Sequence, residues 1–201
     1  MGSREVYGTA RGPLPRLAEP FARRARARRH ERFVAIVRPG GLRIVDVGCG
    51  AIGLRGRAPE LDVTGVDVVE RPAYRGPFVR ADASERLPFA DGEFDLAYCS
   101  SVIEHVPRAR REAFAAELRR VARGWYVQTP AWSFPIEPHS LLPAAHWLPA
   151  AIRRPYWRFG ASGGWEDVEL LRRREIEALF GPAEAERFGP LAKSWVSVRL
   201  P

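Results

Sequence analysis

The sequence predicts an α/β fold built around a mainly parallel sheet, and three observations support this prediction. A β-branched run over residues 42–47 leads into a turn that carries Gly48, Gly50 and Gly53. A second strand-like run ends at Asp67, 21 residues after Asp46, a distance that suits one strand–helix–strand unit. Strand-like and helix-like segments then alternate as far as residue 128, which is the order that a parallel sheet requires.

The elements follow in order from hydrophobic periodicity and from Gly and Pro signals. We expect a loop over residues 1–16 and an amphipathic helix over about 17–37, which Pro39-Gly40-Gly41 ends. Strands are expected at 42–47, 62–67, 77–80, 94–99 and 124–128, with helices near 51–57, 101–104 and 109–122. A helix over 165–180 and two strands near 183–188 and 193–199 complete the chain.

The segment 131–164 breaks this alternation. It holds Trp132, Trp147 and Trp157, two histidines and five prolines. An aromatic insertion after a strand's carboxyl end is where an α/β enzyme places a substrate lid. A hydrophobic flap that completes the core is the plain alternative, and the prolines argue against one helix lying on a membrane surface.

The composition indicates one domain, residues 1–201. Hydrophobic residues make up 46% of the chain and charged residues 28%, as in ordinary globular proteins. No apolar run reaches the ~18 residues of a membrane span and the start lacks a signal-like apolar region, so we expect a cytoplasmic protein without stable membrane insertion. We divide the domain into an N-terminal loop and basic helix (1–40), a cofactor-binding core (42–130), a lid (131–164) and a C-terminal helix with a strand pair (165–201).

Charge and cysteine content narrow the partners. The formal net charge is +8, and arginines crowd residues 23–32. A solvated helix face is the favoured interpretation of that run, and binding to an acidic or phosphorylated surface is the sharper alternative. The two cysteines do not indicate a disulfide scaffold, and no Cys/His cluster has zinc-site spacing, so no metal site is predicted.

Four short motifs carry a family resemblance. They read Asp-Val-Gly-Cys-Gly at 46–50, Gly-Val-Asp at 65–67, Ala-Asp-Ala at 81–83, and Leu-Pro-Phe-Ala-Asp-Gly-Glu-Phe-Asp at 87–95, which runs on to Val-Ile-Glu-His-Val at 102–106. In this order and spacing the chain resembles class I S-adenosylmethionine-dependent methyltransferases of the small-molecule branch, over about residues 40 to 130. The resemblance implies a Rossmann-like seven-stranded sheet, mostly parallel with an antiparallel last strand, and helices on both faces, with the lid following the fifth strand.

The resemblance also implies S-adenosylmethionine as cofactor. We expect Gly48 and Gly50 to bring backbone close to it, because glycine permits close approach. Asp67 is expected at the ribose diol, and Asp82 with the Ala83 backbone at the adenine amino group. Asp46 is expected to face the methionine amine or to order the loop. Val68 and Ser100 complete the expected cofactor-binding set.

The candidate catalytic residues are His139, His105 and Glu137. Methyl transfer needs a base only when the acceptor must lose a proton, and otherwise depends on alignment and desolvation. His139 is the candidate base, and Glu137 lies two residues earlier, within reach to orient it. His105 follows the fourth strand; packing or a place beside the cofactor is the alternative to a catalytic role, and a structural link within the lid is the alternative for His139.

The favoured function is methyl transfer to oxygen or nitrogen of a small organic acceptor, with hydrophobic and aromatic compounds as candidates. An RNA methyltransferase is the first alternative, suggested by the net charge; against it, the fourth strand ends Tyr98-Cys99-Ser100-Ser101 rather than in an Asn/Asp-Pro-Pro-aromatic motif. A nicotinamide-dependent reductase is the second; the glycines permit it, but Asp46 and the 87–106 motif speak against it. A non-catalytic protein of the same fold is the third.

Overall fold

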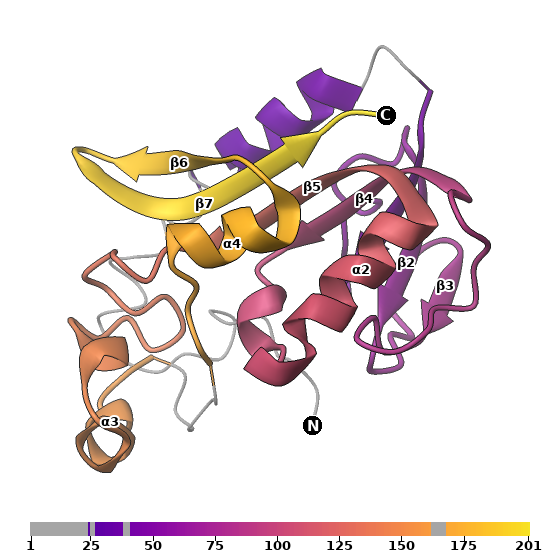
Figure 1. Ribbon diagram of the computed structural model, residues 1–201. Coiled ribbons are helices and arrows are strands. Elements are labelled where there is room, and N and C mark those ends of the chain that lie inside the picture. Colours follow the sequence, from indigo (N-terminus) through magenta and orange to yellow (C-terminus); the bar gives the residue numbers. More distant parts are fainter. Residues whose placement is uncertain (1–23, 25–26, 38–40, 162–167) are drawn as a thin grey trace.

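The computed structural model describes residues 24, 27–37, 41–161 and 168–201, and its centre is one seven-stranded sheet (Figure 1). The strand order is β3-β2-β1-β4-β5-β7-β6. The strands are β1 (Arg43–Val47), β2 (Asp62–Asp67), β3 (Phe78–Arg80), β4 (Phe94–Ser100), β5 (Ala122–Pro130), β6 (Ala183–Phe188) and β7 (Leu191–Arg199). Strands β1 to β5 pair in parallel, and β7 is antiparallel to both β5 and β6. The prediction of a mostly parallel sheet with an antiparallel last strand is confirmed.

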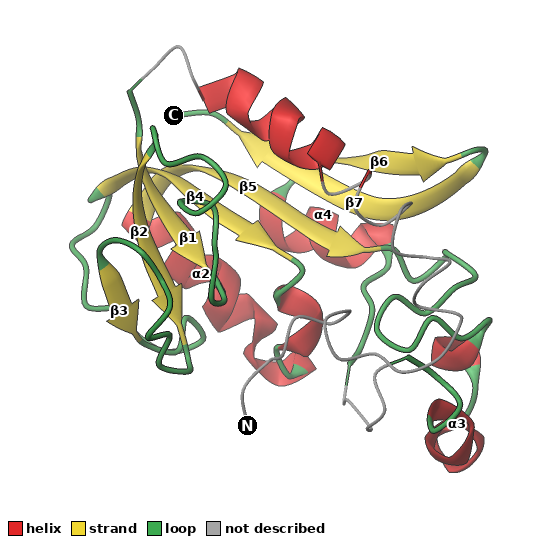
Figure 2. Ribbon diagram, turned by 180° about the vertical axis from the view of Figure 1, so that it is seen from behind, coloured by secondary structure: helices red, strands yellow, loops and turns green. Residues whose placement is uncertain are grey.

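Helices cover both faces of this sheet (Figure 2). The helices α2 (Arg111–Val121) and α4 (Arg173–Phe180) lie on one face, and the helix that includes residues 27–37 lies on the other. Alternation along β1 explains the two cores, because successive strand side chains point to opposite faces. Val45 and Val47 pack with the α2 side, whereas Ile44 packs with Phe33 of the 27–37 helix.

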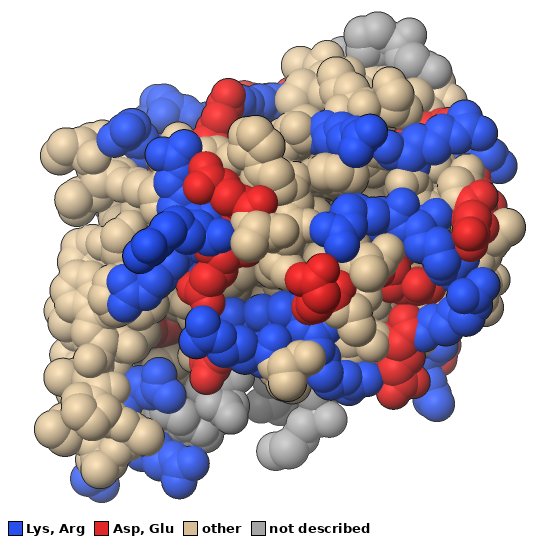
Figure 3. All heavy atoms as spheres, in the orientation of Figure 1, with Lys and Arg blue, Asp and Glu red and all other residues tan. Residues whose placement is uncertain are grey.

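Ion pairs attach the 27–37 helix to the sheet. Arg29 donates to both carboxylate oxygens of Glu186 on β6, at 2.8 to 3.1 Å, and Arg32 pairs with Glu184 at 2.7 Å. Burial alone would lower the pKa of Arg29, but the Glu186 carboxylate outweighs it and the pKa is raised. In the part of the basic run that the structure describes, these two arginines are therefore engaged within the protein. On the face shown in Figure 3, arginines and carboxylates are interspersed.

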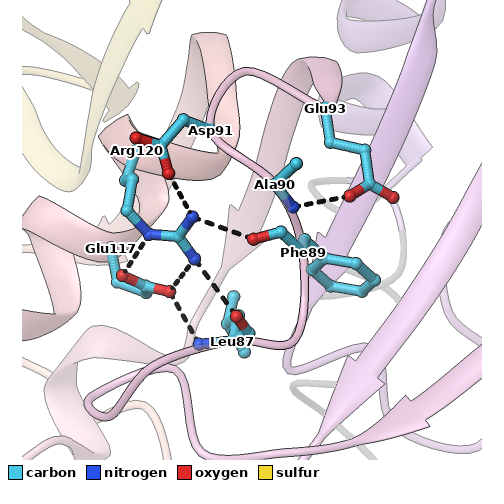
Figure 4. Close-up of polar contacts among 7 residues, drawn as sticks. All are labelled: Leu87, Phe89, Ala90, Asp91, Glu93, Glu117 and Arg120. Atoms are coloured by element: carbon cyan, nitrogen blue, oxygen red, sulfur yellow. Dashed lines mark hydrogen bonds and ion pairs between the residues drawn. The ribbon is translucent and has the colours of Figure 1, made fainter.

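The loop that carries the 87–95 motif is held by α2 (Figure 4). Arg120 donates to the carbonyl oxygens of Leu87 (3.1 Å) and Phe89 (2.9 Å) and to the carboxylate of Asp91 (2.6 Å). The same guanidinium binds the Glu117 carboxylate at 2.5 and 2.9 Å, and Glu117 accepts the Leu87 N–H at 2.6 Å. These contacts from Arg120 and Glu117 therefore attach the loop that precedes β4 to helix α2, which follows β4.

Two predicted helices differ from the structure. Residues 51–57 form turns rather than a helix, because Gly53 adopts φ +61° and the Leu54 N–H donates to the Asp46 carboxylate. The C-terminal helix begins at Arg173, since the chain just before it pairs with the end of β5: Ala131 and Leu171 form a parallel bridge. The loop predicted at 1–16 and residues 162–167 lie outside the described residues.

The segment after β5 is mostly irregular and lies at one end of the sheet, as Figures 1 and 2 show. It contains the short helices η4 (Ala145–Trp147) and α3 (Ala150–Trp157). Its role as a lid stays a prediction. None of the helices in the described ranges has the length and apolar composition needed to cross a bilayer.

Candidate functional site

The glycine turn after β1 places backbone at the carboxyl edge of the sheet. Gly48 has φ +73°, and a Cβ there would lie 2.3 Å from a methyl of Val102, so any larger side chain clashes. Gly50 has φ +64°, and a Cβ there would meet nothing within 4 Å. The Gly48 and Cys49 N–H groups both donate to the Val66 carbonyl, at 2.8 and 3.1 Å. Gly48 is thus required for packing, while Gly50 faces open space.

Asp46 lies beneath this turn and is 3% exposed. Its carboxylate accepts the Leu54 N–H at 2.6 Å and lies where a Cβ on Gly53 would approach to 2.9 Å. Burial raises the pKa of Asp46 to about 7, although the bond from Leu54 opposes the shift. In this structure the side chain orders the loop, which is one of its two expected roles.

Asp67 ends β2 and its carboxylate is surrounded by donors. It accepts the Gly50 N–H and the Val69 N–H, each at 3.0 Å. Arg71 binds both of its oxygens, at 2.9 and 3.1 Å. The next residue, Val68, is 60% exposed although it is apolar. Gly50, Asp67 and Val68, expected in one cofactor site, therefore lie together; Arg71 was not expected, and its only sequence signal is a cation four residues after the acid.

Asp82 and Ala83 follow β3. Asp82 accepts the Ser84 N–H at 2.8 Å and the Ser84 hydroxyl at 2.6 Å, and pairs with Arg110 at 3.3 Å. Burial would raise the pKa of Asp82, but the bonds from Ser84 and Arg110 outweigh burial and lower it. Ala83 is 4% exposed and packs in the core.

Ser100 ends β4 and belongs to a polar group at the ends of β4 and β5. Its hydroxyl donates to the Gln128 side-chain oxygen at 2.8 Å and accepts from Arg29 at 3.3 Å. Ser101 donates to the same oxygen at 3.1 Å and adopts φ +58°. Sequence reasoning missed Gln128, which is 1% exposed. A polar side chain within the apolar run of the fifth strand was the available signal.

The short helix η2 (Ile103–His105) carries the candidate His105 and, beside it, Glu104. Glu104 is 1% exposed, and its Oε2 accepts the Thr129 hydroxyl at 3.0 Å. Burial raises the pKa of Glu104, while nearby His139 opposes the shift. His105 lies beside His139, with ring centroids 4.9 Å apart and planes at 86°. Desolvation and then the proximity of His139 lower the pKa of His105 to about 4.

His139 is brought to this helix by the segment after β5 and is 4% exposed. Its Nδ1 lies 2.8 Å from Glu137 Oε1, and Glu137 Oε2 accepts the His139 N–H and the Ser140 hydroxyl. Burial would raise the pKa of Glu137, but these hydrogen bonds outweigh it and lower the pKa. An ionised carboxylate only accepts, so Nδ1 carries the proton of the hydrogen bond to Glu137.

The structure thus assembles two groups of expected residues. Asp46, Gly48, Gly50, Asp67 and Val68 lie at the ends of β1 and β2. The second group lies beyond β4 and β5 and contains His105, Glu137 and His139, together with Glu104, which sequence reasoning did not select as a site residue. His146, by contrast, bonds the Trp132 carbonyl at 2.9 Å and serves packing within the segment.

Comparison with known proteins gives a consistent result. Residues 45–124 match the model of a methyltransferase domain family. An uncharacterized methyltransferase of Mycobacterium sp. (strain JLS) is 37% identical over 98 residues, which cover 42% of this chain and 36% of that protein. One of Mycobacterium tuberculosis (strain ATCC 25177 / H37Ra) is 43% identical over 63 residues, covering 31% and 23%. The match therefore spans about a third or less of the length of these curated relatives.

Solved structures share the fold over most of the chain. The PH0226 protein of Pyrococcus horikoshii OT3 has a TM-score of 0.62 at 18% identity and covers 89% of this chain and 90% of its own. Magnesium protoporphyrin IX methyltransferase of Synechocystis PCC 6803, with bound SAH, has a TM-score of 0.60 at 14% identity and covers 98% and 92%. The 1,6-didemethyltoxoflavin-N1-methyltransferase of Burkholderia thailandensis has a TM-score of 0.55 at 15% identity, covering 85% and 75%. The sequence over residues 45–124 matches a methyltransferase domain, and the fold is shared with methyltransferases of solved structure; both are similar to class I S-adenosylmethionine-dependent methyltransferases.

Proposed function

We propose that the chain transfers a methyl group from S-adenosylmethionine to an oxygen or nitrogen of a small organic acceptor. The observation that carries the proposal is the junction of β1 and β2, where the Gly50 N–H donates to Asp67 and the space over Gly50 is open. Because glycine has no side chain, a ribose and its neighbouring groups can approach this backbone closely and meet the buried carboxylate beside it. The exposed apolar side chain of Val68 suits a flat adenine ring.

The proposed assignment of the cofactor-binding residues follows from these positions. Gly48 and Gly50 shape the backbone, and Asp67 accepts from the ribose hydroxyls. A ribose at Asp67 competes with Arg71 for the carboxylate, because the guanidinium takes both oxygens in this structure. Asp82, the Ala83 backbone and Ser100 are proposed to complete the site, with Asp46 holding the turn in place from below.

The acceptor is proposed to lie on the side of β4 and β5, near His105 and His139. S-adenosylmethionine supplies an electrophilic methyl group on a sulfonium centre. A hydroxyl acceptor must lose its proton, and we propose His139 as the base that receives it, with Glu137 holding the ring through Nδ1. An amine acceptor that is already neutral needs only alignment and exclusion of water.

A small acceptor is favoured over a nucleic acid. Arg29 and Arg32 of the basic helix pair with Glu186 and Glu184 on β6, so these charges serve the fold. Two structural neighbours, a magnesium protoporphyrin IX methyltransferase and a 1,6-didemethyltoxoflavin-N1-methyltransferase, are also named for small acceptors. Retention on heparin that falls steeply with salt would instead favour an RNA substrate.

The direct test is a screen with S-adenosylmethionine labelled in its methyl group. Aromatic and aliphatic alcohols, phenols and amines are offered in turn, and labelled products are identified by mass spectrometry. We expect label in an O-methyl or N-methyl product of one acceptor class. Cofactor binding without transfer to any acceptor would favour the non-catalytic alternative, and NADH binding without S-adenosylmethionine binding would overturn the proposal.

A further inference from the structure

Three side chains with metal-ligating atoms converge beyond the ends of β4 and β5. Glu104 and His105 are consecutive on η2, and His139 comes from the segment after β5. One ligand atom from each lies within 4.8 Å of the others. The two imidazole rings are neighbours, with centroids 4.9 Å apart. Two imidazoles and one carboxylate form a donor set typical of divalent transition metals.

The Glu104 carboxylate gives a second, independent indication. The residue is 1% exposed, and its Oε2 accepts from Thr129. Its Oε1 is buried and has no hydrogen-bond partner among the described residues. A buried, unsatisfied carboxylate oxygen is costly, because folding has removed its water without a replacement. A cation beside Oε1 would restore that lost interaction.

The surroundings of His139 give a third indication. Glu137 Oε1 lies 2.8 Å from His139 Nδ1, so the carboxylate and the ring are hydrogen-bonded through Nδ1. A carboxylate behind a histidine in this way fixes the tautomer and the ring orientation of metal ligands. Glu137 is itself held by the Ser140 hydroxyl at 2.7 Å.

We propose that Glu104, His105 and His139 bind one divalent transition-metal ion, with Glu137 as the positioning residue for His139. Three protein ligands leave further coordination positions for an exogenous oxygen, as in catalytic metal sites. Resting on the proposed methyl transfer, we further infer that the acceptor binds the ion through a hydroxyl. Metal ligation then occupies His139 Nε2, so the ion replaces His139 as the group that activates the hydroxyl: it lowers the pKa of that hydroxyl, and the proton leaves to solvent. The oxygen lone pair then forms the bond to methyl carbon as the carbon–sulfur bond breaks, giving a methyl ether and S-adenosylhomocysteine.

The test measures metal binding without turnover. The full chain is stripped with a chelator, and Mn²⁺ or Zn²⁺ is titrated by calorimetry, with Mn²⁺ also followed by electron paramagnetic resonance. We expect one ion per chain in the wild type. Glu104→Gln, which keeps the shape of the buried side chain, and His105→Ala should each weaken binding at least tenfold. Glu137→Gln should weaken it by roughly 10–100-fold, the usual effect of losing an outer partner.

The matched control is His30→Asn, which removes a histidine from the 27–37 helix and should leave metal affinity unchanged. Circular dichroism of each metal-free variant verifies folding, and His105→Ala keeps the test valid if Glu104→Gln does not fold. A folded wild type that binds neither ion overturns the proposal, as does wild-type affinity in His105→Ala. S-adenosylhomocysteine binding, measured separately on metal-free protein, distinguishes the two claims: its absence overturns the methyl-transfer function and leaves the metal site intact.

Discussion

The Arg120 network allows a prediction whose size follows from the geometry. Arg120→Met keeps the apolar stem of the side chain and removes its guanidinium. The carbonyls of Leu87 and Phe89 lose their charged donor, and the buried Glu117 carboxylate loses its cation while keeping the Leu87 N–H. Asp91 is 76% exposed on its side chain, so its ion pair contributes little.

Two lost hydrogen bonds at about 1 kcal/mol each, with about 1–2 kcal/mol for the carboxylate left unpaired, give a loss of roughly 3–4 kcal/mol. For a chain of this length the melting temperature should fall by roughly 5–15 °C. Urea unfolding followed by circular dichroism measures the free energy. Arg123→Met is the matched control, since the exposed Arg123–Asp95 pair at 3.5 Å should contribute less than about 0.5 kcal/mol.

The network also predicts a pH dependence. The ion pair with Arg120 lowers the pKa of Glu117 despite burial, so this carboxylate is more acidic in the folded than in the unfolded chain. The contribution of Glu117 to folding stability is complete above the ordinary glutamate pKa of about 4.3. It is lost as pH falls through the lower pKa that Glu117 has in the folded chain. The difference in the free energy of unfolding between wild type and Arg120→Met should therefore become smaller in acid. This reasoning would be refuted if Arg120→Met lost less than about 1 kcal/mol of unfolding free energy at pH 7. It would also be refuted if the difference from wild type did not change with pH.

The remaining predictions concern the site. Asp67→Ala should weaken S-adenosylhomocysteine binding by roughly 1.5–3 kcal/mol in calorimetry. The control Asp62→Ala, at the exposed start of the same strand, should leave this binding unchanged. Equal effects of the two variants would place the ribose acceptor elsewhere. Gly48→Ala should lower the melting temperature sharply because its Cβ has no room. Gly50→Ala, strained by about 1–2 kcal/mol, should fold and lose cofactor affinity. The reverse pattern would contradict the geometry. With a hydroxyl acceptor, His139→Ala should lower turnover by roughly 10²–10⁴-fold with cofactor affinity near normal; unchanged turnover would remove His139 from the chemistry.

Sequence patterns were sufficient for the sheet, because each strand ends in a recognisable turn. Val45 and Val47 flank Asp46, and the glycines that follow force the chain to turn. The predicted helix at 51–57 was wrong because a local pattern does not show that Asp46 binds the Leu54 N–H or that Gly53 takes a positive φ. The start of α4 was misplaced for a similar reason: Leu171 pairs with Ala131, forty residues earlier in the chain.

The site was predictable only where its residues are close in sequence. Glu137 and His139 are two residues apart, and their contact could be anticipated from that spacing. The approach of His139 to Glu104 and His105 depends on the path of the segment after β5, which composition does not encode. The ion pair between Arg71 and Asp67 was not predicted, because a cation four residues after an acid is common on protein surfaces.

The central claim is that the β1–β2 junction binds S-adenosylmethionine. Calorimetry of the full chain with S-adenosylhomocysteine, run beside NADH and repeated on Asp67→Ala, tests it most directly. We expect stoichiometric binding of S-adenosylhomocysteine to the wild type, no heat with NADH, and weakened binding in the variant. NADH binding without S-adenosylhomocysteine binding, or equal S-adenosylhomocysteine affinity in wild type and a folded Asp67→Ala, would contradict the account.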